Sequence, residues 1–119
     1  QLVHCFSVGS FCTAGCTALK HSLSRPAPDY KLYPSVTPSW DNTARRKQRM
    51  FLFHNATPEK YGRWLREVLR RFKPYSAEEN FVFINAWNEW AEGNHLEPDM
   101  KWGGEYLAAT LRAIEEDER

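Results

Sequence analysis

The chain has 119 residues, of which 42% are hydrophobic and 26% charged, a composition that fits one soluble globular domain and excludes a disordered tail. Its 16 basic and 15 acidic residues leave a net charge of +1, so no overall field attracts nucleic acid or an anionic membrane. No run approaches the roughly 20 apolar residues of a membrane-spanning helix, and the expected partner is a neutral or modestly charged small molecule.

Aromatic side chains make up 14% of the chain, with five tryptophans. Flat rings near polar side chains suit stacking against sugar faces, and they suit a protein core equally well. Composition alone leaves both interpretations open.

All three cysteines, Cys5, Cys12 and Cys16, fall in the first 16 residues, and their odd number argues against a closed disulfide framework. A reducing compartment fits this pattern, so the cytoplasm is the expected location. The Cys12 to Cys16 spacing is loose for a metal site and no second ligand pair follows, so we expect neither a metal nor another cofactor.

Residues 1–29 show no regular period and stay unassigned, with a proline-containing break before residue 30. They lack the basic start and the continuous apolar run of a signal peptide. Because the chain begins at Gln1 without a methionine, we expect a fragment, a processed chain or a truncated reading frame.

Residues 30–119 show a regular succession of elements. Residues 31–37 are typical of a short strand, interrupted by Pro34 and followed by a polar and aromatic loop at 38–42. Residues 50–53 form a second brief apolar run, which we expect to be a strand or an extended piece.

The clearest prediction is a helix that starts after Thr57. Thr57 is a good N-cap, Pro58 suits the first helical position, and Glu59 complements the helix dipole. Pro74 ends the helix. Its apolar residues recur every three or four positions and predict one buried face: Tyr61, Trp64, Leu65, Val68, Leu69 and Phe72.

Residues 80–87 are nearly all apolar, as in a parallel strand covered on both faces. A loop over 93–104 and a closing helix over 105–116 follow. The predicted inward stripe of that helix is Tyr106, Leu107, Leu111 and Ile114.

This alternation predicts an α/β fold with parallel strands, either a doubly wound sheet or part of a β/α barrel. In both, ligands bind at the carboxyl ends of the strands. The polar segments 40–42 and 88–92 both follow predicted strands, so we expect them to form one site.

Glu89 and Glu92 are three positions apart, directly after the apolar strand and flanked by Trp87 and Trp90. Two carboxyl groups held close, with rings excluding water, supply the acid and the base that cleavage of a glycosidic bond needs. The plainer interpretation is a solvated first helical turn. For Trp87 core packing is favoured over sugar stacking, whereas the two are balanced for Trp90.

Further residues in the two segments offer hydrogen bonds, charge or stacking to a substrate. Some have simpler roles open to them, such as a turn at Asp41 or loop hydrogen bonds at Asn85 and Asn88. The candidate substrate-binding residues are Trp40, Asp41, Asn42, Arg45, Asn85, Trp87, Asn88, Trp90 and His95. Glu97 and Asp99 follow His95, and we expect rim residues there rather than a metal cluster.

Four segments together, residues 38–46, 57–61, 83–93 and 96–99, closely resemble the WbsX-like family of bacterial polysaccharide-biosynthesis proteins, which is similar to glycoside hydrolase family 99. The likeness covers about residues 30–114. It implies that residues 30–119 are the C-terminal units of a (β/α)8 barrel, incomplete in this chain, with an oligosaccharide or polysaccharide as substrate. Incomplete barrel edges imply self-association.

In the hydrolase family, endo-acting α-mannosidases carry two glutamates in an Asn-Glu-Trp-x-Glu-Gly pattern. That pattern falls on Glu89 and Glu92. The resemblance implies that Glu89 deprotonates a sugar 2-hydroxyl to give an anhydro-sugar, and that Glu92 is the acid and then the base at the leaving oxygen. Ala91 and residues 94–96 differ from the hydrolases, which leaves the sugar undefined.

Two other functions stay open from the sequence. WbsX-like proteins are often described as glycosyltransferases, but Gly103 and Gly104 lack the pattern of a phosphate-binding loop. We therefore favour hydrolase-type chemistry in surface-polysaccharide metabolism. The third function is a truncated, non-catalytic module that only binds a glycan.

Overall fold

The computed structural model of the chain describes residues 24, 26, 28–46 and 50–117. The predictions for the three cysteines and for most of residues 1–29 lie outside these residues. The elements are, in order, β1 (Ser35–Val36), α2 (Pro58–Arg71), β2 (Phe83–Ile84), β3 (Asn88–Glu89), η1 (Trp90–Glu92), β4 (Asn94–His95) and α3 (Glu105–Asp117).

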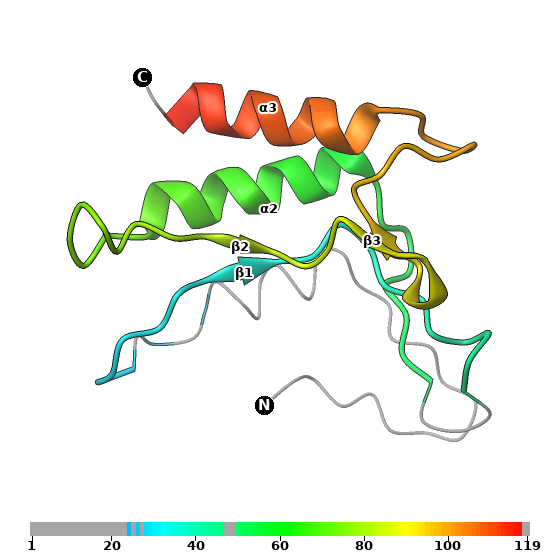
Figure 1. The fold of residues 1–119 in the computed structure, drawn as a ribbon, viewed down its shortest axis with the longest axis horizontal. Coiled ribbons are helices and arrows are strands. Elements are labelled where there is room, and N and C mark those ends of the chain that lie inside the picture. Colours follow the sequence, from blue (N-terminus) through cyan, green and yellow to red (C-terminus); the bar gives the residue numbers. More distant parts are fainter. Residues whose placement is uncertain (1–23, 25, 27, 47–49, 118–119) are drawn as a thin grey trace.

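The first part of the fold is a β-α-β unit. β1 and β2 pair in parallel, with Ser35 opposite Phe83 and Val36 opposite Ile84. Helix α2 connects them and packs on β1, while α3 packs along α2 on the side away from the strands (Figure 1). β1 and β2 lie within the strands predicted at residues 31–37 and 80–87 and have the parallel direction expected of an α/β fold, although each is much shorter than the pattern indicated.

Helix α2 begins as its sequence predicts. The Thr57 hydroxyl accepts a hydrogen bond from the backbone N–H of Lys60 at 3.3 Å, and Pro58 occupies the start of the first turn. The helix ends at Arg71 because Pro74 disfavours helical backbone in the residues before it. Its buried face carries Tyr61, Leu65 and Val68.

Helix α3 faces α2 through small residues. Ala109 and Ala113 are buried, and a Cβ added to Gly62 would lie 3.2 Å from the Cβ of Ala109. This close approach explains why the predicted inward stripe was partly wrong: Leu111 is 57% and Ile114 is 43% exposed, and both lie on the other side of the helix. Tyr106 is buried as predicted.

The strand around β2 is covered on one side only. Exposure alternates along it, with Val82, Ile84 and Ala86 partly buried. Phe83 is 56% exposed and Trp87 is 52% exposed on the opposite side. The prediction of a strand covered on both faces was therefore wrong for the residues that the structure describes. Helix α2 supplies the cover for one face, and those residues place nothing over the other.

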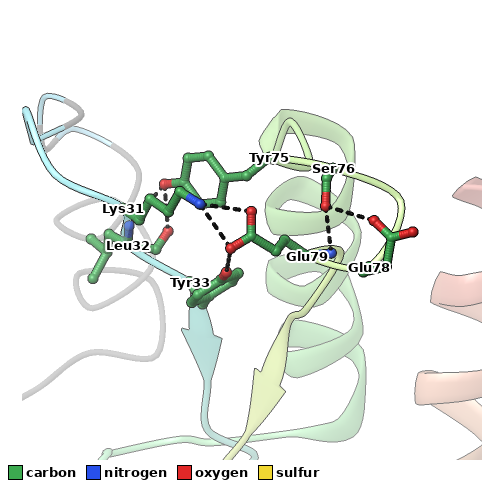
Figure 2. Close-up of polar contacts among 7 residues, drawn as sticks. All are labelled: Lys31, Leu32, Tyr33, Tyr75, Ser76, Glu78 and Glu79. Atoms are coloured by element: carbon green, nitrogen blue, oxygen red, sulfur yellow. Dashed lines mark hydrogen bonds and ion pairs between the residues drawn. The ribbon is translucent and has the colours of Figure 1, made fainter.

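The amino ends of the strands are joined by an ion pair. Lys31 Nζ lies 2.8 and 2.7 Å from the two carboxylate oxygens of Glu79, which also accepts a hydrogen bond from the Tyr33 hydroxyl (Figure 2). The Tyr75 hydroxyl accepts from the backbone N–H of Leu32 at 2.8 Å. These contacts connect the segment before β1 to the segment before β2.

The candidate residues lie at the other end of this pair. The run at residues 50–53 is not a strand: Leu52 makes a single antiparallel bridge to Asp41. The predicted loop at 93–104 begins with β4, which pairs antiparallel with β3. No helix among the described residues has the length and apolar character needed to cross a membrane.

Candidate functional site

The site is built on the turn from β3 through η1 to β4. Asn88 lies opposite His95 and Glu89 opposite Asn94, and the short helix η1 connects the two strands. Gly93 makes the reversal possible because its φ is +54°, a left-handed value that costs other residues more than glycine. Glu89 and Glu92 thus sit on one tight hairpin.

The loop after β1 is fastened to this hairpin, as the sequence predicted. The backbone N–H of Asp41 donates to the Glu92 carbonyl at 2.7 Å, and the Ser39 hydroxyl donates to the Gly93 carbonyl at 2.5 Å. Arg45 Nη1 lies 2.8 Å from Oε1 of Glu92. Two segments about fifty residues apart in sequence therefore meet beyond the carboxyl ends of the strand pair.

The two glutamates differ in their surroundings. Glu92 is partly buried and paired with Arg45. Glu89 is exposed, and its carboxylate makes no hydrogen bond or ion pair with any residue that the structure describes. The hairpin thus presents one carboxylate that is held in place and one that faces solvent.

Trp87 and Trp90 are 52% and 49% exposed, so they do not enclose the glutamates in the described part of the chain. The preference for core packing at Trp87 was therefore wrong there. Its backbone carbonyl still has a structural role, because it accepts hydrogen bonds from Leu96 and Glu97 at 2.9 and 3.0 Å.

Trp90 is held by two partners. The His95 ring stacks on the indole with ring centroids 3.8 Å apart and planes 21° apart. The indole N–H donates to Oε2 of Glu97 at 2.6 Å. The sequence placed Glu97 only on the rim, and nothing in its spacing identified it as the partner of Trp90.

His95 is held in turn by the residues that follow it. Its Nδ1 lies 3.1 Å from the Glu97 carbonyl oxygen, and its Nε2 lies 3.8 Å from Asp99 Oδ2. The other Asp99 oxygen accepts from the backbone N–H groups of Lys101 and Trp102. Within the described ranges, no three His, Cys, Asp or Glu side chains group in a way that would hold a metal ion.

Two candidate binding residues shape the loop instead. Asn42 is only 7% exposed, and its side-chain oxygen accepts from the Phe51 N–H at 2.8 Å. Trp40 accepts a backbone hydrogen bond from Phe53 at 2.7 Å, and its buried indole N–H has no partner among the described residues. Both were predicted to contact substrate, and the contacts seen here are internal.

Asp41 also serves the loop, since its Oδ1 accepts from the N–H and hydroxyl of Thr43 at 2.9 and 2.6 Å. Asn85 and Asn88 have exposed side chains at the end of β2 and in β3. The backbone N–H of Asn85 donates to the Val36 carbonyl at 3.0 Å.

Ser39, which contacts the hairpin, is also a neighbour of Tyr106 in α3, and the sequence did not reveal this proximity. Ser39 holds the Gly93 carbonyl, and its hydroxyl is close enough to Tyr106 to influence the ionisation of the phenol. Burial, and then the charge of Asp99, raise the pKa of Tyr106 to about 12, and the Ser39 hydroxyl offsets part of that rise. The raised pKa means that the folded chain favours the neutral phenol.

Comparison with known proteins identifies relatives. The family model described as Glycosyltransferase WbsX matches residues 13–110. The chain is 47% identical over 91 residues to "Uncharacterized protein WxcX" from two strains of Xanthomonas campestris pv. campestris, B100 and ATCC 33913. The match covers 76% of this chain and 13% of each relative. No solved structure matches.

Proposed function

Because the chain belongs to the WbsX glycosyltransferase family, we propose that its hairpin with Glu89 and Glu92 is the acid/base part of a site that acts on glycosidic bonds. One observation carries this proposal. The loop with Asp41 and Arg45 is fastened to Glu92 across the carboxyl ends of a parallel strand pair, where α/β folds bind ligands.

The proposed chemistry is the hydrolase type implied by the resemblance to glycoside hydrolase family 99. Glu89, which faces solvent, takes the proton of a sugar 2-hydroxyl while that oxygen attacks the anomeric carbon. Glu92 gives its proton to the departing oxygen, and an anhydro-sugar forms. Glu92 then deprotonates a water that attacks the anomeric carbon, and Glu89 returns its proton to the 2-oxygen.

Arg45 has a defined part in this scheme. Its guanidinium lies 2.8 Å from Oε1 of Glu92 and fixes the position of that carboxyl group. Arg45 therefore holds Glu92 before the substrate arrives.

We also propose the fold of the complete enzyme: a (β/α)8 barrel of which this chain supplies C-terminal units. The β1-α2-β2 arrangement followed by α3 is the observation on which this rests. Among the described residues, the strand pair is not extended on either side, so self-association along a strand edge is part of the proposal. Analytical ultracentrifugation of the chain tests it, since a strict monomer contradicts self-association.

A second candidate is transfer from a nucleotide sugar, which the family description favours. The third is glycan binding without turnover by this chain, since it spans 13% of the curated relatives it matches. Three assays separate these functions: release of reducing ends from yeast mannan and bacterial surface polysaccharides, release of nucleoside diphosphate from GDP-mannose and UDP-glucose, and binding of the same polysaccharides.

The variants Glu89→Gln and Glu92→Gln test the residues. Each keeps the shape of the side chain and removes its charge, so we expect turnover to fall by at least 100-fold while thermal unfolding is unchanged. Wild-type rates in both variants reject the proposed site.

A further inference from the structure

Trp90 combines exposure with a fixed position. Half of its side chain is accessible, although its indole N–H is bonded to Glu97 and one ring face is covered by His95. Glu97 holds both rings, because its carboxylate accepts from the indole and its carbonyl lies 3.1 Å from His95 Nδ1. A side chain held in this way loses little conformational freedom when a ligand binds.

The part of the Trp90 indole that stays free for a ligand allows only one kind of contact. The only hydrogen-bond donor of the indole is already used, and His95 covers one face. What remains is a flat aromatic surface, which attracts the C–H groups of a ligand and offers no hydrogen bond of its own. A pyranose ring with the axial hydrogens of C3 and C5 on one side has the matching apolar face.

Trp90 lies on the same turn as the glutamates. It is the first residue of η1, directly after Glu89, and Glu92 is the last residue of the same turn. The indole and the two carboxyl groups therefore belong to one short turn.

We propose that the uncovered face of Trp90, held by His95 and Glu97, is the stacking platform for the pyranose ring adjacent to the bond on which the glutamates act. The choice of a sugar as ligand rests on the proposed function. The substrate class is a glycan whose ring at this position carries axial hydrogens at C3 and C5, as in the gluco, manno and galacto configurations.

Saturation-transfer NMR on the full chain tests the platform, with the methyl α-D-pyranosides of mannose, glucose and galactose as probes. We expect transfer to be strongest at H3 and H5, to be lost in Trp90→Ala and to be largely kept in Trp90→Phe, which retains a flat face. Tyr30, which is 65% exposed, supplies the control, and Tyr30→Ala should leave the signal unchanged.

Glu97 supplies a matched pair of variants. Glu97→Gln keeps an oxygen that accepts from the indole and should keep the signal, whereas Glu97→Leu removes it and should reduce the signal at least threefold. Absence of transfer from all three glycosides, or equal transfer in wild type and Trp90→Ala, overturns the inference.

The test also separates this inference from the proposed chemistry. The double variant Glu89→Gln, Glu92→Gln should still bind through Trp90. If wild-type turnover persists in both single glutamate variants while the Trp90 signal behaves as expected, only the proposed chemistry fails. If the glutamate variants lose turnover while Trp90→Ala binds normally, only the platform fails.

Discussion

Arg45 Nη1 lies 2.8 Å from Oε1 of Glu92, 47 positions further along the chain. This pair joins the loop after β1 to the hairpin after β2, and it brings together the two polar segments that the sequence singled out. The other contacts between these segments involve backbone atoms, at Asp41 N–H and at the Gly93 carbonyl. Replacing Arg45 therefore removes the side-chain contact of Glu92 and leaves the other contacts between the two segments in place.

Arg45→Gln should lower kcat/KM for glycan turnover at least tenfold, because Glu92 loses the group that holds it. Arg45→Lys keeps the charge but not the fork geometry and should lose less. The Arg45 and Glu92 side chains are 52% and 25% exposed, so the stability cost should stay below about 1 kcal/mol. Rates and thermal unfolding measured together check this, and unchanged kcat/KM in Arg45→Gln contradicts it.

The two glycines with left-handed backbone allow a matched comparison. Gly93 and Gly103 have φ of +54° and +52°, but a Cβ on Gly93 would meet the Cβ of Asp41 at 3.1 Å, whereas one on Gly103 would meet nothing within 4 Å. Gly103→Ala should cost about 1 kcal/mol from backbone strain alone. Gly93→Ala should cost more and should also reduce turnover, because it pushes the Asp41 loop away from Glu92.

Denaturant unfolding and kinetics of the two variants measure these effects. If Gly93→Ala and Gly103→Ala lose the same stability and Gly93→Ala keeps full turnover, the contact between the hairpin and the loop is not needed for activity.

The packing of the helices provides a second matched pair of variants, at Leu65 and Leu111. Leu65 is 2% exposed and Leu111 is 57% exposed. Leu65→Ala should destabilise the chain by roughly 2–5 kcal/mol, since it opens a cavity beneath α2. Leu111→Ala should change stability by at most about 0.5 kcal/mol. A large loss at Leu111 would mean that a surface outside the described residues covers this side of α3.

Tyr106 predicts how stability changes in alkali. Its pKa rises from an ordinary 10.0 to about 12 in the folded chain, mainly through burial. The folded state therefore favours the neutral phenol. This contribution to stability is fully present below pH 10, and it is lost as the pH rises from 10 to 12.

In Tyr106→Phe this alkaline loss should become smaller over the same pH range. Unfolding midpoints across pH 9 to 12 provide the measurement. An identical alkaline slope in both proteins would show that Tyr106 is not the group responsible.

The helices were predictable because their signals are local. Thr57, Pro58 and the spacing of Tyr61, Leu65 and Val68 fix the start and the buried face of α2 without reference to the rest of the chain. The buried face of α3 was harder to predict. Its contact with α2 uses Ala109 and Ala113, and small residues give a weak periodic signal even where they allow the closest approach.

The site was predictable in outline and not in detail. Polar residues after two predicted strands indicated that residues 40–42 and 88–92 lie together, and the hydrogen bond from the Asp41 N–H to the Glu92 carbonyl confirms this contact. The partners of Trp90 depend on the β3–β4 hairpin, which folds His95 back over the indole. This hairpin could not be predicted from the sequence, because Asn94 and His95 are not typical strand residues.

Asn42 shows the same limit in another way. An asparagine beside an aspartate can bind a sugar hydroxyl or stabilise a loop. Asn42 is buried and accepts a hydrogen bond from the Phe51 N–H, so its side chain stabilises the loop. Only the three-dimensional arrangement distinguishes these two uses of the same amide.

The most direct test of the central claim is the rate of glycan turnover in Glu89→Gln and Glu92→Gln, each compared with wild type on the same polysaccharides. If the hairpin carries the acid and the base, both variants fold as wild type does, and both lose turnover by at least 100-fold. Turnover at the wild-type rate in both variants would contradict the assignment of this site.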